Sequence, residues 1–208
     1  MSRAEDRSVF TSPAVWVDGV RIALLVAALL RHAAGDAFGF VALISASMGL
    51  DLLDGALARR FGRVSRFGEA LDYGIDLVSH SVLWVLSGFP FAPVMMALEW
   101  SAGIVVLWFS ARRSDHWKNL LTAAHAPILG RYFANRQRNA LAAFAGISHF
   151  GFRIAWYLGY GDTWVSDLTV PGIIVFEVVT AYMIWAPLRL RFYGRGRARQ
   201  TRLDADPE

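Results

Sequence analysis

Four aspartates lie within one short stretch, DLLDGALARRFGRVSRFGEALDYGID, which begins at Asp51 and ends at Asp76. Asp51 and Asp54 are three residues apart, and Asp72 and Asp76 are four apart, so on helices each pair shares one face. Four carboxylates at short range cannot all stay ionised without cations. Carboxylate oxygens suit Mg²⁺ or Mn²⁺, and two such ions would bind the attacking and leaving oxygens of a phosphoryl displacement. The spacing therefore predicts a two-metal site for phosphoryl transfer.

Small residues accompany these acids. Gly55 and Ala58 follow Asp54 by one and four residues, and Gly68 precedes Asp72 by four. On helices they would leave a bare strip beside the carboxylates, with room for a phosphate-bearing ligand. The same pattern is typical of close helix packing, and spacing alone does not choose between the two. Solvated helix-end acids are the weaker alternative for the carboxylates, because ionisable groups within membrane spans are costly and usually functional.

The chain around these acids is strongly apolar. Hydrophobic residues make up 55% of its 208 residues and charged residues 18%. The apolar residues come in blocks of about twenty, which is typical of membrane-spanning helices. We predict an all-α integral membrane protein with one domain over residues 1–208, including a lead-in at 1–13 and a basic tail at 191–208. Six transmembrane helices are predicted at residues 14–31, 37–58, 68–87, 91–111, 139–159 and 168–190.

Basic residues gather on one side of the predicted spans. Arginines follow the second, fourth and sixth spans, whereas the opposite connections carry only Arg31. The positive-inside rule then places both termini and the acid-rich end in the cytoplasm. The membrane would be the inner membrane of a bacterium or the endoplasmic reticulum of a eukaryote. Because the charges follow the topology and do not gather on a soluble face, we expect no nucleic-acid partner.

The acid-rich stretch also resembles a known signature. Its pattern, Asp51-x2-Asp54-Gly55-x2-Ala58-Arg59-x8-Gly68-x3-Asp72-x3-Asp76, is similar to that of the class I CDP-alcohol phosphatidyltransferases, with no position missing. The family's six-helix membrane fold would cover nearly the whole chain. The resemblance implies that Asp51, Asp54 and Asp72 bind two metal ions, and that Asp76 is both a ligand and the general base. It implies contacts to a CDP-lipid from Gly55, Ala58, Arg59, Ser65 and Gly68, and a homodimer.

The implied reaction transfers a phosphatidyl group from CDP-diacylglycerol, a membrane lipid, to a polar alcohol. Asp76 would take the proton of the acceptor hydroxyl, which attacks the lipid-side phosphorus while CMP leaves. Arg21, within the first predicted span, resembles the family's first-helix arginine and could contact a phosphate. An ion pair with Asp18, three residues earlier, is the alternative.

The acceptor is indicated by further stretches. DGVRIALLVAALL, SASMGLDLLDG and ILGRYFANRQRNALAAFAGISHFGFRIAWYLG resemble the eukaryotic type of phosphatidylinositol synthase, which implies myo-inositol. The chain departs from that type in the fourth span, where LEWSAG stands in place of an Asp followed by a Ser-His pair. Glycerol 3-phosphate, inositol phosphate and serine remain alternative acceptors. The candidate acceptor or phosphate contacts are Arg21, Glu99, Arg131, Arg136, His149 and Arg153.

Some polar residues within the spans have a structural alternative. His149 and Arg153, four residues apart, could line an acceptor pocket or form a hydrogen-bonded pair between helices. We expect Glu177 to be a structural partner for another helix and His80 to be a packed histidine. A remote alternative for the whole chain is a cation transporter, which would have polar residues near the bilayer midplane and repeats between its halves.

Overall fold

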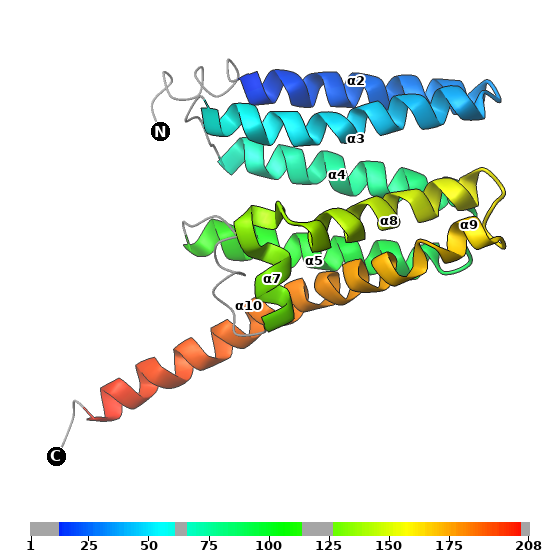
Figure 1. Ribbon diagram of the computed structural model, residues 1–208. Coiled ribbons are helices and arrows are strands. Elements are labelled where there is room, and N and C mark those ends of the chain that lie inside the picture. The colour runs from blue at the N-terminus through cyan, green and yellow to red at the C-terminus, as the bar shows by residue number, and fades with distance from the viewer. Residues whose placement is uncertain (1–12, 61–65, 114–126, 205–208) are drawn as a thin grey trace. The chain divides into compact units, whose positions relative to one another are not determined.

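The computed structural model describes residues 13–60, 66–113 and 127–204, and within these ranges every regular element is helical (Figure 1). The predicted all-α class is confirmed for this part of the chain. The elements are α2 (Pro13–Ala33), α3 (Ala37–Arg60), α4 (Arg66–Ser87), α5 (Ala92–Arg113), α7 (Pro127–Phe133), the 3₁₀ helix η1 (Ala134–Gln137), α8 (Ala140–Tyr157), α9 (Trp164–Asp167) and α10 (Val170–Asp204).

The long helices match the predicted spans in place, with differences at their ends. The largest difference concerns α10: the predicted span at 168–190 agrees with its apolar part, Val170–Leu188, but the helix itself continues to Asp204. Figure 1 shows it as one unbroken ribbon. The sequence has no proline between Pro187 and Pro207, so every residue there has a backbone N–H that can donate a helical hydrogen bond. The helix can therefore continue into the arginine-rich segment. The predicted basic tail therefore begins as helix.

Two described helices are long and apolar enough to cross a membrane. They are Ala92–Arg112 within α5 and Val170–Leu188 within α10. Asp72, Asp76 and His80 make α4 more polar, and His149 and Arg153 do the same for α8. The six-span topology and the cytoplasmic position of the termini stay predictions.

The chain forms two compact units by its internal contacts. The first comprises residues 1–92 and 153–160, and the second comprises residues 93–152 and 161–208. We predicted one functional domain over residues 1–208, and a division by internal contacts does not test that prediction.

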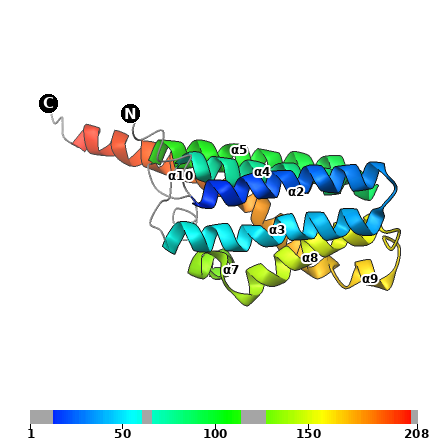
Figure 2. The ribbon, with the colours of Figure 1, turned by 90° about the horizontal axis from the view of Figure 1, so that it is seen from above.

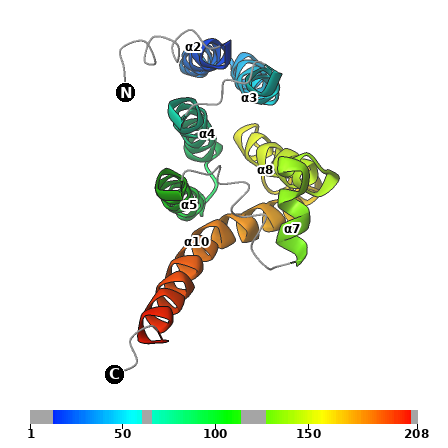
Figure 3. The same ribbon diagram turned by 90° about the vertical axis from the view of Figure 1, so that its left-hand side faces the viewer.

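In the first unit, α2 and α3 lie side by side and α4 packs next to them (Figures 2 and 3). Gly35 makes the turn between α2 and α3 with a φ of 77°, a conformation that favours glycine. Asp36 caps α3, since its Oδ1 accepts a hydrogen bond from the Gly39 N–H at 2.8 Å. The buried faces follow helical spacing, with Asp18, Arg21, Leu25 and Ala28 on α2 and Phe40, Ile44 and Ser47 on α3.

In the second unit, α8 and α10 approach each other closely at a glycine. A side chain at Gly172 would collide with Ser148 and would lie 3.2 Å from the Phe144 carbonyl oxygen. Only a residue without a Cβ fits there, as at many close helix contacts. This contact brings the polar residues of α8 and α10 together, while Val106, Ala145, Phe152 and Met183 supply apolar packing.

Polar and apolar side chains are distributed unusually for a helical protein. Arg21 and Arg153 are fully buried, and Glu99 is only 5% exposed. Large apolar side chains face outward on several helices, among them Leu30, Val85, Ile104, Ile147 and Ile174. Buried ionisable groups within an apolar exterior are typical of proteins whose helices contact lipid.

Candidate functional site

Three of the predicted metal ligands come together in the first unit. Asp51 on α3 and Asp72 and Asp76 on α4 each offer a carboxylate oxygen, and these oxygens lie within 4.8 Å of one another. All three side chains are partly exposed, at 35%, 40% and 31%. The predicted shared face of Asp72 and Asp76 is present, because both contact the same guanidinium. The two helices thus form one acidic cluster.

Arg21 lies against this cluster from α2. Its Nη1 donates to Asp72 Oδ1 at 2.5 Å and lies 3.4 Å from Asp51 Oδ1, and its Nη2 donates to Asp76 Oδ1. The sequence suggested an ion pair with Asp18, and that pair is present at 3.7 Å between Arg21 Nη1 and Asp18 Oδ1. The contacts with α3 and α4 were not predicted, because no spacing rule relates α2 to helices so far along the chain.

The backbone of Arg21 is also held. Ser47 is buried on α3 and its hydroxyl donates to the Arg21 carbonyl oxygen at 3.1 Å. Ser47 was not among the predicted site residues, although its place one turn before Asp51 was a possible signal. This bond connects α2 to α3 beside the acidic cluster.

Other signature residues are only partly described. Asp54, Gly55, Ala58 and Arg59 lie in the last two turns of α3, where the structure describes the backbone alone. Gly68 lies in the first turn of α4, one turn before Asp72. Ser65 lies outside the described residues. The predicted contacts of these residues stay predictions.

The segment before α8 carries the predicted acceptor arginines. Arg131 is exposed in the last turn of α7, and Arg136 belongs to η1, where its side chain is not described. Two residues beside them, Asn135 and Gln137, have positive φ values of 53° and 66°. Non-glycine residues rarely adopt this conformation unless surrounding contacts impose it. The backbone at Asn135 and Gln137 therefore depends on contacts with neighbouring residues.

Asn139 provides these contacts. Its Nδ2 donates to the Tyr132 carbonyl at 2.8 Å and to the Ala134 carbonyl at 3.0 Å. Its Oδ1 accepts from the Ala142 N–H at 3.0 Å, which caps the start of α8. Sequence reasoning did not single out Asn139. Its position directly before α8 is the usual place of a helix cap and was the available signal.

Tyr132 lies buried in the same segment. Its ring packs edge-on against Phe133, with 5.2 Å between the ring centroids. Burial disfavours the charged phenolate and raises the pKa of Tyr132 to about 12. The side chain is thus a neutral packing group at physiological pH.

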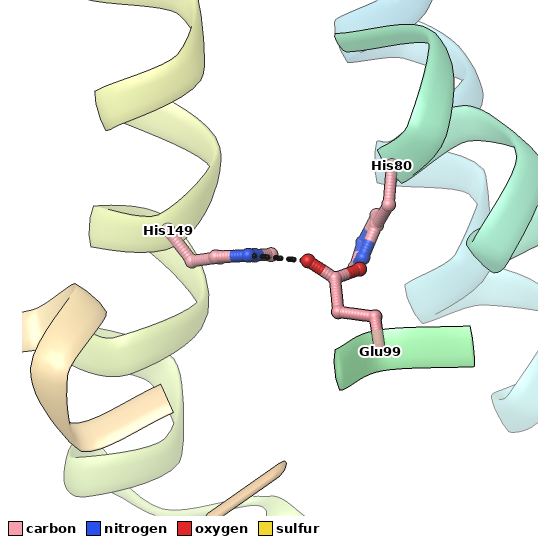
Figure 4. A group of neighbouring side chains, drawn as sticks. All are labelled: His80, Glu99 and His149. Carbon is pink, nitrogen blue, oxygen red and sulfur yellow. Dashed lines mark hydrogen bonds and ion pairs between the residues drawn. The ribbon is translucent and has the colours of Figure 1, made fainter. Parts of the chain in front are cut away.

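A second polar cluster lies in the second unit. The Nε2 atom of His149 on α8 lies 3.0 Å from Glu99 Oε1 on α5 and 3.4 Å from Glu177 Oε1 on α10. Figure 4 shows the His149 ring directed at the Glu99 carboxylate. One face of the His149 ring is covered by an apolar side chain, since it stacks on the Phe176 ring with 3.7 Å between the centroids. His149 thus forms a hydrogen bond between helices, which was one of its two predicted roles. Glu177 contacts a side chain of another helix, as predicted.

Arg153, one turn after His149, has its own partners in the first unit. Its Nη1 donates to the His80 carbonyl oxygen at 3.3 Å, and its guanidinium lies over the Trp84 ring at 5.3 Å from the centroid. The side chain is fully buried. The cation–π and backbone contacts are two of the interactions that stabilise the buried guanidinium. Acceptor contacts by Glu99, His149 and Arg153 stay predictions.

The acidic cluster suits a hard divalent cation. Its described donors are all carboxylate oxygens, and an ion of the size of Mg²⁺ binds oxygen at about 2.0–2.1 Å. Oxygens within 4.8 Å of one another can therefore reach a shared ion with small side-chain adjustments. The donor set gives no preference between Mg²⁺ and Mn²⁺.

Comparison with protein families gives one match. The model of the CDP-alcohol phosphatidyltransferase family, described as "CDP-alcohol phosphatidyltransferase", matches residues 16–143. This region holds Arg21, the acidic cluster and the segment with Arg131 and Arg136, and it ends before His149. Comparison with curated proteins and with solved structures gave no significant match.

Proposed function

The chain belongs to the CDP-alcohol phosphatidyltransferase family, and we propose that it transfers the phosphatidyl group of CDP-diacylglycerol to myo-inositol. The family's reaction moves a substituted phosphate from a CDP-alcohol to an alcohol, as a step of phospholipid synthesis. The observation that carries the proposed transfer of the phosphatidyl group is the meeting of Asp51, Asp72 and Asp76 within the matched region.

In the proposed mechanism, Asp76 accepts the proton of the acceptor hydroxyl. The hydroxyl oxygen then forms a bond to the lipid-side phosphorus, and the bond from that phosphorus to the oxygen of CMP breaks. CMP leaves with the electron pair of that bond, and the proton remains on Asp76 until it passes to water. The place of Asp76 beside Asp51 and Asp72, with its side chain 31% exposed, supports this assignment, because an acceptor hydroxyl can then approach it next to the metal ligands.

Asp51, Asp54, Asp72 and Asp76 are the proposed ligands of two Mg²⁺ or Mn²⁺ ions. When bound, these ions would supply positive charge that neutralises the diphosphate and the departing CMP. The proposed contacts to the CDP-lipid are Gly55, Ala58, Arg59, Ser65 and Gly68. The bare faces of the glycines would let a diphosphate approach the helices closely.

The proposal of myo-inositol rests on the resemblance of the stretches around the signature to phosphatidylinositol synthases. The segment of α7, η1 and the start of α8 carries residues that are proposed to bind the acceptor. Its shape is maintained by Asn139, and it presents Arg131 at the surface. Arg21, Glu99, Arg136, His149 and Arg153 are the further proposed contacts to acceptor or phosphate.

A phosphorylated acceptor is the second candidate, favoured by the arginines of this segment. Arg131, Arg136 and Arg138 fall within eight residues, and arginine binds phosphate oxygens in a bidentate manner. Glycerol 3-phosphate and inositol phosphate would form ion pairs with them through the phosphate group, whereas uncharged myo-inositol could form only hydrogen bonds. Substitution of Arg131 and Arg136 by Gln distinguishes a phosphorylated acceptor from myo-inositol. A KM that rises only for phosphorylated acceptors supports the second candidate, and an unchanged KM for all acceptors rejects it.

We propose that all six long helical segments cross the membrane, with both termini and the acidic cluster on the cytoplasmic side. The buried ionisable groups and outward apolar side chains support this placement. A site at headgroup level would leave the acyl chains of the donor in the bilayer while CMP departs into water. The protein is proposed to act as a homodimer in this membrane.

The test is release of CMP from CDP-diacylglycerol by the purified protein in detergent, with and without Mg²⁺ or Mn²⁺. A panel of radiolabelled myo-inositol, glycerol 3-phosphate, inositol phosphate and serine identifies the acceptor. We expect metal-dependent release with myo-inositol. Absence of release with every acceptor, in active lipid, would reject the enzyme assignment and favour the cation-transporter alternative.

A further inference from the structure

The Arg21 guanidinium and a metal ion would use the same carboxylate oxygens. Arg21 Nη1 is 2.5 Å from Asp72 Oδ1 and 3.4 Å from Asp51 Oδ1, and Nη2 contacts Asp76 Oδ1. These are three of the proposed metal ligands. A divalent ion bound to these oxygens would lie within a few ångströms of the guanidinium, where like charges repel strongly. Both cations therefore cannot keep their closest contacts at once.

A second partner for Arg21 lies on its own helix. Asp18, one turn earlier on α2, places Oδ1 at 3.7 Å from Arg21 Nη1, and its side chain is only 3% exposed. This distance is longer than a hydrogen bond, so the guanidinium now favours α3 and α4. A change of side-chain rotamer would shorten the contact with Asp18. The helix backbone need not move, because the Ser47 hydroxyl holds the Arg21 carbonyl.

We infer that Arg21 is an internal cation that exchanges with divalent metal at the acidic cluster: it neutralises Asp51, Asp72 and Asp76, and when metal binds it turns to Asp18. The inference rests on the proposed function in one respect, namely that these aspartates bind the metal. It makes Arg21 a positioning residue whose presence opposes metal binding. A residue that only supported the ligands would strengthen metal binding instead.

The exchange is tested by Mn²⁺ binding to the full-length protein in detergent. The protein is stripped with EDTA and titrated with MnCl₂, and free Mn²⁺ is measured by electron paramagnetic resonance. Arg21→Met, which removes the charge but keeps much of the length, is expected to bind Mn²⁺ on the order of tenfold more tightly than the wild type. Without metal, the same variant is expected to melt at a lower temperature, because three carboxylates then lack their shared counter-charge.

A matched control is available on the same helix. Arg31 also pairs with an aspartate, Asp36, at 3.6 Å, but its side chain is 61% exposed and lies far from the cluster in sequence. Arg31→Met is expected to leave Mn²⁺ affinity unchanged. Equal or weaker Mn²⁺ binding by Arg21→Met, relative to the wild type, would overturn the exchange.

Asp18 gives an independent measurement. Asp18→Asn removes the partner to which Arg21 turns, so Mn²⁺ binding should weaken, and this effect should shrink when Arg21→Met is also present. If Arg21→Met does not fold without metal, Asp18→Asn alone decides. Unchanged Mn²⁺ affinity in that variant rejects the exchange.

The outcome is separable from that of the proposed function. If Arg21→Met binds Mn²⁺ more tightly than the wild type but no acceptor gives CMP release, the exchange is supported and the proposed reaction is rejected. Metal-dependent CMP release, together with an Arg21→Met variant of unchanged Mn²⁺ affinity, would keep the reaction and reject the exchange.

Discussion

The Arg21 guanidinium donates to the Asp72 carboxylate at 2.5 Å, across 51 positions of sequence. This pair connects α2 to the helix that carries the second half of the acidic signature. Asp72 in turn lies close to Asp51 and Asp76, so one arginine contacts both halves of the signature. The candidate site therefore consists of three helices, although the signature itself lies on two.

Substitution of Asp76 by Asn tests the assignment of the general base. The amide keeps the shape of the side chain but cannot take a proton, so CMP release should fall by a factor of about 10² or more. Steady-state CMP release measures this loss, and circular dichroism checks that the helices remain. Asp167→Asn, at an exposed position in α9, serves as the control and should retain full activity. Near-normal turnover by Asp76→Asn would refute the base assignment.

Substitution of Asp51 by Asn tests metal binding separately from proton transfer. One charged ligand is lost while Asp72 and Asp76 remain, so the Mn²⁺ concentration for half-maximal activity should rise by roughly tenfold. Activity measured over a range of Mn²⁺ concentrations gives this value. High Mn²⁺ should restore much of the rate in Asp51→Asn and none of it in Asp76→Asn. An unchanged metal requirement would remove Asp51 from the ligand set.

The contact of His149 with Glu99 is expected to stabilise the second unit. Both side chains are almost fully buried, and removal of His149 leaves the Glu99 carboxylate buried without its partner at 3.0 Å. His149→Ala should therefore lower the free energy of unfolding by about 3 kcal/mol or more. Denaturation with sodium dodecyl sulfate, followed by circular dichroism, measures this change. In the Glu99→Gln background the loss should be smaller, and equal losses in both backgrounds would show that the pair is not coupled.

Tyr132 should make the protein sensitive to alkaline pH. The unfolded chain ionises tyrosine near pH 10, whereas burial raises the pKa of Tyr132 in the folded protein to about 12. The folded state is thus favoured fully below pH 10, and this contribution is lost as the pH rises toward 12. Melting temperatures between pH 9 and pH 12 should fall less steeply for Tyr132→Phe than for the wild type. Tyr160→Phe, at an exposed position, should follow the wild type.

Asn139 should affect acceptor binding through the shape of the α7 and η1 segment. Asn139→Asp keeps the oxygen that caps α8 but loses the two bonds donated to the Tyr132 and Ala134 carbonyls. Its melting temperature should fall, because a carboxylate oxygen would face two carbonyl oxygens in place of a donor, and the KM for the acceptor should rise with kcat largely kept. Asn139→Ala also loses the cap and should cost about 1 kcal/mol of stability in addition. A KM unchanged in both variants would exclude this segment from the acceptor site.

The helices and the acidic signature could be predicted from the sequence because both depend on local patterns. Blocks of apolar residues predict helices, and separations of three or four residues place side chains on one helix face. The shared face of Asp72 and Asp76 and the ion pair of Asp18 with Arg21 are relations of this kind, and the structure contains both. The continuation of α10 to Asp204 was not predicted, because the spans were placed by hydropathy and the segment after 190 is rich in arginine.

Contacts between helices were decided by the tertiary structure alone. The sequence by itself determined which residues can share a helix face, and a signature specific enough to indicate the family and its chemistry. It did not determine that Arg21 would contact Asp51 and Asp72, or that His149 would lie between Glu99 and Glu177. The physical reason is that such contacts depend on which helix faces pack together, at points such as Gly172. That choice depends on the burial of the whole chain, and no local spacing encodes it.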